Sequence, residues 1–308
     1  MLNQINKTEK CDSYSGYPSL DEVKSALVKI FVDLIKLCEE HGLTYYLSGG
    51  TAIGAVRHNG FIPWDDDIDI YLRRDDYERF LSLRNSLPAD SSYEIIDMQT
   101  PGYYLPFAKF CKKDSTIWEH GNIPFIMGLY VDVFPLDEFN ETKENIKLAS
   151  DYRKAWEAYP RSLRKHKLQH FTSKIRQGHL RPIPRMIEDI LWICPREHVY
   201  RERIIEMDRA IKEIKGDYLY CYGLNRGALN KVYPKDWFAE RVDISFEGLT
   251  VKIQKGYDNY LSKQFGNYMQ FPPESERLST HKRFFLELDH PRRSQEEVLA
   301  IKKELGEL

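Results

Sequence analysis

The stretch that decides the fold is residues 45–70, which read YYLSGGTAIGAVRHNGFIPWDDDIDI. An apolar run ends in Ser48-Gly49-Gly50, and a short helical stretch follows. Four carboxylates then fall within five residues, at positions 65, 66, 67 and 69. Like charges in one place disfavour ionisation and folding unless a cation or several hydrogen-bond donors neutralise them. The stretch therefore predicts a cation-binding site.

Two of these carboxylates have the spacing of a metal-binding edge. If residues 67–72 are extended, Asp67 and Asp69 point to one side while Ile68 and Ile70 enter the core. Magnesium prefers one or two protein carboxylates together with waters and phosphate oxygens. We therefore expect Mg²⁺, with Mn²⁺ as an alternative, to be held here for a phosphorylated ligand.

A third carboxylate comes from a later apolar segment. Asp132 lies between Val131 and Val133 in a stretch that reads as a strand. A lone Asp in a strand is costly to bury unless it is paired or bound to a metal. Asp132 is thus the predicted third metal ligand.

The glycine pair predicts a phosphate-binding turn. Gly49 and Gly50 permit close backbone approach, and the amides of the helix that begins near Thr51 form an anion-binding end. Arg57, at the far end of this helical stretch, offers a fork of donors to phosphate. The alternative for Arg57 is an ion pair with the carboxylate cluster.

Composition narrows the class of protein. The chain has 308 residues, 42% apolar and 30% charged, with a net charge of -2, which argues against nucleic-acid binding. Its five cysteines contain no Cys-x-x-Cys pair, so we expect reduced thiols and neither a disulfide framework nor a zinc site. The N-terminus lacks an apolar signal core, and no stretch approaches the ~18 apolar residues of a membrane span. We expect a cytoplasmic protein, with peripheral contact with the inner face of the membrane as an open alternative.

Patterning predicts the main elements. Ser19 and Glu22 form the signature of a capping box before a helical apolar repeat that stops at His41-Gly42. A second helix is expected over 75–81, and the C-terminal part is expected to be helical around Pro272-Pro273. The predicted strands and the predicted hairpin fall at 93–96, 105–110, 130–134 and 242–253.

The segment 141–215 is polar, helical in pattern and locally basic. Between Arg153 and Arg185 the chain has ten Lys or Arg and one acidic residue, Glu157. One interpretation is a surface for an anionic membrane or a charged polymeric acceptor, since basic clusters gain ~1 kcal/mol per residue near anionic lipid. The other is the solvated face of a helical insertion.

With these residues in hand, the chain resembles the LicD family, which is related to fukutin. The resemblance covers about residues 20–137 and 255–285, and its motifs are these: LSGGTAIGAVRH at 47–58, GFIPWDDDIDI at 60–70, VDVFPLD at 131–137, and a C-terminal block that includes Arg277 and His281.

The resemblance implies an α+β fold with a nucleotidyltransferase-like mixed sheet flanked by helices. Gly49 and Gly50 match the turn, Asp67 and Asp69 the Asp-x-Asp pair, and Asp132 the third carboxylate. We expect a flexible N-terminus (1–18), a catalytic core (19–140), a helical, locally basic insertion (141–240) for which a face toward the acceptor or membrane is one interpretation, and a helical C-terminal segment that completes the active site (241–308).

The resemblance also implies transfer of a phospho-alcohol group from a nucleotide-activated donor, commonly CDP-choline. The acceptor would be a sugar hydroxyl of a glycan or lipid-linked glycan, such as a teichoic acid or lipopolysaccharide precursor. Asp132, or less favourably Asp66, would accept the hydroxyl proton. Lys109 and His281 would contact phosphate or acceptor, although a surface lysine and a structurally paired histidine are the alternatives.

A choline headgroup favours an aromatic face. The candidates near the motifs are Trp64, Tyr103, Tyr104 and Trp118, each of which has a core position as its alternative. Asp65 and Asp66 have another open interpretation, in which one of them caps the turn or pairs with Arg73 or Arg74.

Two other functions remain open from the sequence. A nucleotidyltransferase would use the same carboxylates to move a nucleoside monophosphate onto a phosphorylated acceptor and would release pyrophosphate. A non-catalytic interaction protein of glycan assembly is disfavoured, because it has no need to keep charge at positions 67, 69 and 132.

Overall fold

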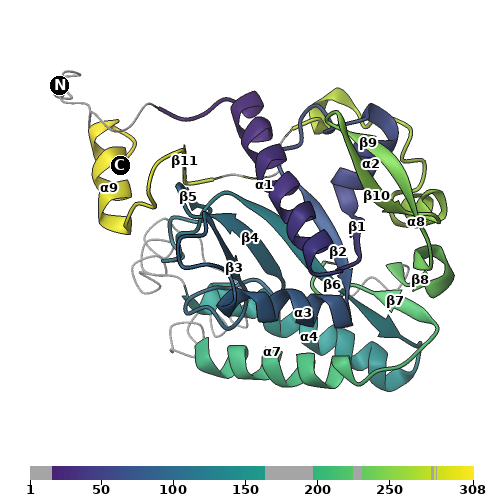
Figure 1. Cartoon of the computed structure of the whole chain (residues 1–308). Helices are drawn as coiled ribbons and strands as arrows, with labels where there is room; N and C mark the ends of the chain where they lie inside the picture. Colours follow the sequence, from purple (N-terminus) through teal and green to yellow (C-terminus); the bar gives the residue numbers. More distant parts are fainter. Residues whose placement is uncertain (1–15, 164–196, 225–230, 279–280, 282) are drawn as a thin grey trace.

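The computed structural model describes residues 16–163, 197–224, 231–278, 281 and 283–308. Within them the chain forms a curled mixed sheet flanked by helices, which confirms the predicted α+β class (Figure 1). Most of the predicted basic segment, from Arg164 to Arg185, lies outside the described residues, as do Cys11 and Cys194. Cys38, Cys111 and Cys221 are buried free thiols.

Helix α1 (Leu20–Glu40) begins where the capping box predicts. The Ser19 side chain accepts from the Glu22 amide, and the Glu22 carboxylate accepts from the Ser19 amide. The buried positions of α1 recur at helical spacing, so one stripe faces the sheet. Helix α1 packs on β4 and β6. The helix therefore covers the strands that carry Lys109 and Asp132.

The main sheet has seven strands, in the order β1-β2-β6-β4-β3, with β7 and β8 continuing from β6. Their bounds are β1 Tyr45–Leu47, β2 Asp69–Arg73, β3 Tyr93–Ile96, β4 Ala108–Lys112, β6 Tyr130–Phe139, β7 Tyr218–Tyr220 and β8 Tyr233–Pro234. Strands β2 and β6 pair in parallel, and the other pairs are antiparallel. The predicted strand 93–96 is confirmed, 105–110 is shifted to 108–112, and 130–134 continues to Phe139.

Helices and short elements surround the sheet. Helix α3 (Arg74–Ser82) follows β2 directly and packs on β2 and β6, while α4 (Lys143–Leu163) and α7 (Glu197–Lys212) pack on each other along one side of the molecule (Figure 1). The 3₁₀ turns are η1 Leu83–Asn85, η3 Lys235–Phe238 and η4 Glu274–Glu276. Helices α4 and α7 together confirm the helical pattern predicted after residue 141. The same segment also contains β7 and β8, which join the main sheet.

The C-terminal part corrects one prediction. The hairpin β9 (Arg241–Phe246) and β10 (Leu249–Gln254) is present, and α8 (Tyr257–Phe265) and α9 (Gln295–Glu304) are helical. Between these helices, however, β11 (Phe285–Leu288) pairs antiparallel with β5 (Ser115–Trp118). The prediction of a C-terminal part helical throughout was therefore wrong at β11, whose pairing with a strand 170 residues earlier leaves no local signal.

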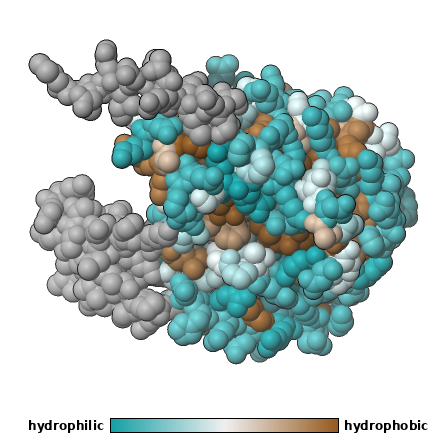
Figure 2. Space-filling view, turned by 60° about the vertical axis from the view of Figure 1, so that its left-hand side comes forward, coloured by the Kyte–Doolittle hydropathy of each residue, from teal (hydrophilic) through white to brown (hydrophobic). Residues whose placement is uncertain are grey.

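Two larger apolar clusters and one small one hold these layers. The largest surrounds β1, β2, β4, β6 and α1; the second joins the end of β6 to α4 and α7; the third lies under α9. Hydrophilic side chains cover most of the face shown in Figure 2, and hydrophobic ones gather in a hollow near its centre. None of the helices in the described ranges has the length and apolar content needed to cross a membrane.

Candidate active site

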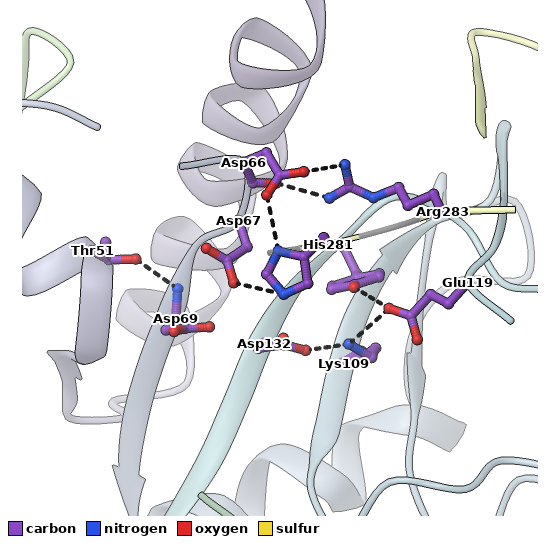
Figure 3. Close-up of polar contacts among 10 residues, drawn as sticks. Thr51, Asp66, Asp67, Asp69, Lys109, Glu119, Asp132, His281 and Arg283 are labelled. Carbon is purple, nitrogen blue, oxygen red and sulfur yellow. Dashed lines mark hydrogen bonds and ion pairs between the residues drawn. The ribbon is translucent and has the colours of Figure 1, made fainter. Parts of the chain in front are cut away.

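Three carboxylates meet at the edge of two neighbouring strands. Asp69 opens β2 and lies directly opposite Asp132 of β6 in the parallel ladder. Asp67 comes two residues earlier, before the strand begins. One oxygen from each of Asp67, Asp69 and Asp132 lies within 4.8 Å of the others (Figure 3). The strand register thus brings together the three residues that the sequence predicted as metal ligands.

The protein leaves this cluster short of positive charge. Desolvation, the charge of Asp67 and that of Asp132 raise the pKa of Asp69 well above its usual value. Desolvation also raises the pKa of Asp132 to about 6, although Lys109 opposes the shift. Asp65 is affected in the same way, since desolvation and Asp67 raise its pKa to about 8. Three hard oxygen ligands that lack a full set of counter-charges fit Mg²⁺, or Mn²⁺ as the alternative.

The glycine turn lies directly against the carboxylates. Helix α2 (Gly49–His58) starts at Gly49, whose φ is 52°. A Cβ on Gly49 would lie 3.0 Å from Asp69 Oδ2, and one on Gly50 would lie 2.5 Å from Asp65 Oδ2. Thr51 Oγ1 accepts a hydrogen bond of 2.9 Å from the Asp69 amide. The two glycines keep the helix N-terminus close to the carboxylates, and Thr51 fixes the start of β2.

Lys109 lies on β4, the strand that pairs with β6 on the side away from β2. It is opposite Asp132 in the β4–β6 ladder, is 1% exposed, and its Nζ is 2.6 Å from Asp132 Oδ1. The ammonium group also lies 3.3 Å from the centroid of the Tyr130 ring and 4.0 Å from Glu119. The hydroxyls of Tyr104 and Tyr130 both donate to Glu119. The alternative of a surface lysine was therefore wrong, because the side chain is buried against a predicted metal ligand. Contact of Lys109 with phosphate or acceptor stays a prediction.

A segment from the C-terminal part completes the site (Figure 3). His281 Nδ1 lies 2.9 Å from Asp66 Oδ1, and its Nε2 lies 3.4 Å from Asp67 Oδ2. Arg283 bonds both the carboxylate and the backbone carbonyl of Asp66. The bond to Asp66, helped by the charge of Asp67, raises the pKa of His281 to about 9 against the effect of desolvation.

These contacts correct the predicted partners of Asp66. Arg74 pairs with Asp137, at an Nη2–Oδ2 distance of 2.9 Å, and Arg73 pairs with Glu138. Neither arginine is the partner of Asp66, because the tertiary fold brings Arg283 there from 217 residues away. Sequence reasoning missed Arg283, whose only local signal is its position two residues after His281.

Arg57 lies away from the three carboxylates. It is eight residues along α2 from Gly49, or about 12 Å at 1.5 Å per residue. Its Nη1 donates to the carbonyls of Tyr268 (2.7 Å) and Gln270 (3.4 Å). Within the described part of the chain Arg57 forms no ion pair with a carboxylate. The structure thus separates Arg57 from the glycine turn with which it was predicted to bind phosphate.

The predicted aromatic faces for choline are mostly core residues. Tyr103, Tyr104 and Trp118 are at most 3% exposed, and Trp118 Nε1 donates to the Ile123 carbonyl. For these three residues the alternative of a core position is confirmed, because each ring is covered by neighbouring side chains. Trp64 is half-buried and packs near the Phe271 ring, with centroids 6.3 Å apart.

Comparisons with known proteins show which family the chain is similar to. Residues 42–183 match the family model described as LicD/FKTN/FKRP, nucleotidyltransferase domain. The chain is 30% identical over 268 residues to the lipopolysaccharide cholinephosphotransferase LicD of Haemophilus influenzae. The matched region covers 80% of this chain and 89% of that protein. A shorter match, 36% identical over 53 residues, is to human ribitol 5-phosphate transferase FKRP and covers 17% of this chain and 11% of FKRP. With this extent of similarity and a carboxylate site built on the matched segment, the chain belongs to the LicD family.

Proposed function

We propose that this protein transfers phosphocholine from CDP-choline, in a Mg²⁺-dependent reaction, to a sugar hydroxyl of a cell-surface glycan precursor such as lipopolysaccharide or teichoic acid. Membership of the LicD family makes it a phospho-alcohol transferase that acts on a glycan. The observation that carries the proposal is the in-register placement of Asp69 and Asp132, with Asp67 beside them, against a glycine turn.

The residues have distinct roles in this proposal. Asp67, Asp69 and Asp132 would hold Mg²⁺, which when bound neutralises charge on the diphosphate and on the leaving nucleotide. Gly49 and Gly50 leave room for donor phosphate oxygens to approach the N-terminus of α2, where backbone amides favour anions.

The proton of the acceptor hydroxyl goes to Asp132. Asp132 belongs to the carboxylate cluster at which the donor phosphates would be held, so it is the carboxylate placed to accept that proton. Asp66 is the weaker candidate, because it lies outside the cluster of three carboxylates and both of its oxygens are bonded, one to His281 and one to Arg283. As the hydroxyl oxygen bonds to the phosphorus of phosphocholine, the bond from that phosphorus to the CMP oxygen breaks, and CMP leaves.

A second candidate is nucleotidyl transfer with the same carboxylates, which the family's nucleotidyltransferase domain keeps open. The two reactions release different products. Phospho-alcohol transfer from a CDP-linked donor releases CMP, whereas transfer of a nucleoside monophosphate from a triphosphate releases pyrophosphate.

The test is to incubate the protein with Mg²⁺ and CDP-choline, CDP-ethanolamine or CDP-glycerol, with and without a glycan-lipid extract. Asp67→Ala removes a proposed ligand, and Asp90→Ala removes an exposed carboxylate elsewhere as the matched control. We expect acceptor-dependent CMP from CDP-choline that is lost only in Asp67→Ala. CMP from another donor alone would overturn the choline assignment, and pyrophosphate from a nucleoside triphosphate would favour the second candidate.

A further inference from the structure

Beside the active site is a compact group of cationic and aromatic side chains that the proposed mechanism does not use. We call Arg57, Trp64, Phe271 and Arg277 the arginine–aromatic cluster. The guanidinium carbons of Arg57 and Arg277 lie 4.6 and 5.4 Å from the centroid of the Phe271 ring, and that of Arg277 lies 5.8 Å from the Trp64 ring. Phe271 is 45% exposed, so the cluster is open to solvent.

The cluster has more positive charge than its neighbours balance. Arg57 Nη1 donates to backbone carbonyls and Arg57 Nε donates to the His58 ring. Arg277 Nε donates to the Pro272 carbonyl. Over the described ranges, the one carboxylate that forms an ion pair with either arginine is Glu274, which is 3.9 Å from Arg277 and has a side chain that is 92% exposed.

Both arginines retain free donors. Within the same ranges, Nη2 of Arg57 and Nη2 of Arg277 have no hydrogen bond or ion pair. Guanidinium groups with free donors that lie over one ring suit a planar or tetrahedral oxyanion.

Two members of the cluster are close in sequence to residues of the carboxylate site. Trp64 is three residues before Asp67, and Arg277 is four residues before His281. His281 in turn contacts Asp67. At 3.3–3.6 Å per residue the chain spans no more than about 10 to 14 Å over these lengths. A glycan of a few sugar units can span that distance, so one whose hydroxyl lies at the metal ligands would reach the cluster with its adjoining units.

We propose that the arginine–aromatic cluster binds an anionic group, phosphate or carboxylate, carried by a sugar of the acceptor glycan. Arg57 and Arg277 bind the oxyanion, and Trp64 and Phe271 contact the adjoining ring. The inference rests on the proposed function, because it assigns the cluster to the acceptor of that reaction. It also gives Arg57 a place on the acceptor side, away from the glycine turn that faces the donor.

The test measures binding without any nucleotide donor, so its result does not depend on the donor being CDP-choline. Wild-type protein, Arg277→Gln, Arg57→Gln and Arg277→Lys are titrated with maltose 1-phosphate and with maltose. Lys36→Gln, an exposed charge on α1, is the matched control. Arg277→Lys keeps the charge with little change of volume, and Phe271→Ala removes only the ring, so the inference stays testable if a Gln variant fails to fold.

We expect wild-type protein and Lys36→Gln to bind maltose 1-phosphate more tightly than maltose. Loss of a charge-assisted contact should reduce that preference by about tenfold in each Gln variant, with a smaller loss in Arg277→Lys. Equal binding of the two sugars by wild-type protein, or an unchanged preference in the Gln variants, would overturn the inference.

A second experiment tests whether the cluster binds a lipid surface and not the acceptor, because Phe265, Met269 and Leu278, which are near Phe271 and Arg277 in the sequence, are also exposed. The same variants are sedimented with vesicles of phosphatidylglycerol and of phosphatidylcholine. If Arg277→Gln lost binding to the anionic vesicles while its sugar preference stayed intact, the cluster would be a membrane contact and the acceptor assignment would be wrong.

Discussion

Replacing Lys109 by Met tests whether this lysine is the protein's own counter-charge for the carboxylate site. Its Nζ is 2.6 Å from Asp132 Oδ1 and both residues are buried, at 1% and 6% exposure. Met has nearly the same length, so the substitution removes charge with little change of packing. Asp132 is then left buried without its ion-pair partner, and nearby Glu119 loses the same cation.

The expected cost follows from that burial. Removing one partner of a buried ion pair destabilises a protein by about 3–5 kcal/mol, whereas an exposed pair contributes about 0–1 kcal/mol. In a chain of this length 1 kcal/mol corresponds to roughly 2 °C in Tm, so Lys109→Met should melt about 6–10 °C lower in EDTA. Lys112→Met is the matched control, because Lys112 is on the same strand and pairs with Asp289, which is 77% exposed.

The assay is thermal and urea unfolding in EDTA for both single variants and for Lys109→Met/Asp132→Asn. The double variant should recover much of the loss, since it no longer buries an unpaired charge. If Lys109→Met lost no more stability than Lys112→Met, or if the double variant were less stable than the single one, the counter-charge role would be refuted.

Three other predictions follow from the site and its supports. Asp69→Asn should melt at or above the wild-type temperature in EDTA, because it relieves repulsion within the carboxylate cluster. Calorimetry should nevertheless show that the variant loses Mg²⁺ affinity. The loss should exceed the roughly 10- to 100-fold that follows from changing a residue that only supports a metal ligand. In the folded protein His281 has a pKa of about 9, above its value in the unfolded chain. Its contribution to stability is therefore fully present below about pH 6.5 and is lost as the pH rises through about 9. Over this pH range the midpoint of urea unfolding in EDTA should fall in wild-type protein but not in His281→Gln. Gly54→Ala should cost about 1–3 kcal/mol in chemical unfolding, since its Cβ would lie 2.3 Å from the Gly60 carbonyl oxygen, and a wild-type midpoint would show that the turn can move.

Local patterns in the sequence were sufficient where the signal lies in neighbouring residues. The capping box at Ser19 and Glu22 defined the start of α1, and the glycine pair defined the start of α2. The alternation of Asp67 and Asp69 identified the carboxylate pair, and the valines beside Asp132 indicated a strand. These features are local because capping, positive φ and strand alternation depend on a few adjacent residues.

Tertiary structure alone decided which charges meet. The β2–β6 register sets Asp132 opposite Asp69, and the β4–β6 register sets Lys109 opposite Asp132. Arg283 and His281 reach Asp66 across more than 200 residues, while Arg57 turns to the carbonyls of residues 268 and 270. Strand register and long-range packing are set by the whole core, and no local pattern records them. The sequence by itself therefore determined the chemical groups of this site and its family, and the fold determined which of those groups meet: three carboxylates at one sheet edge, Lys109 beside Asp132, and Arg57 apart from them.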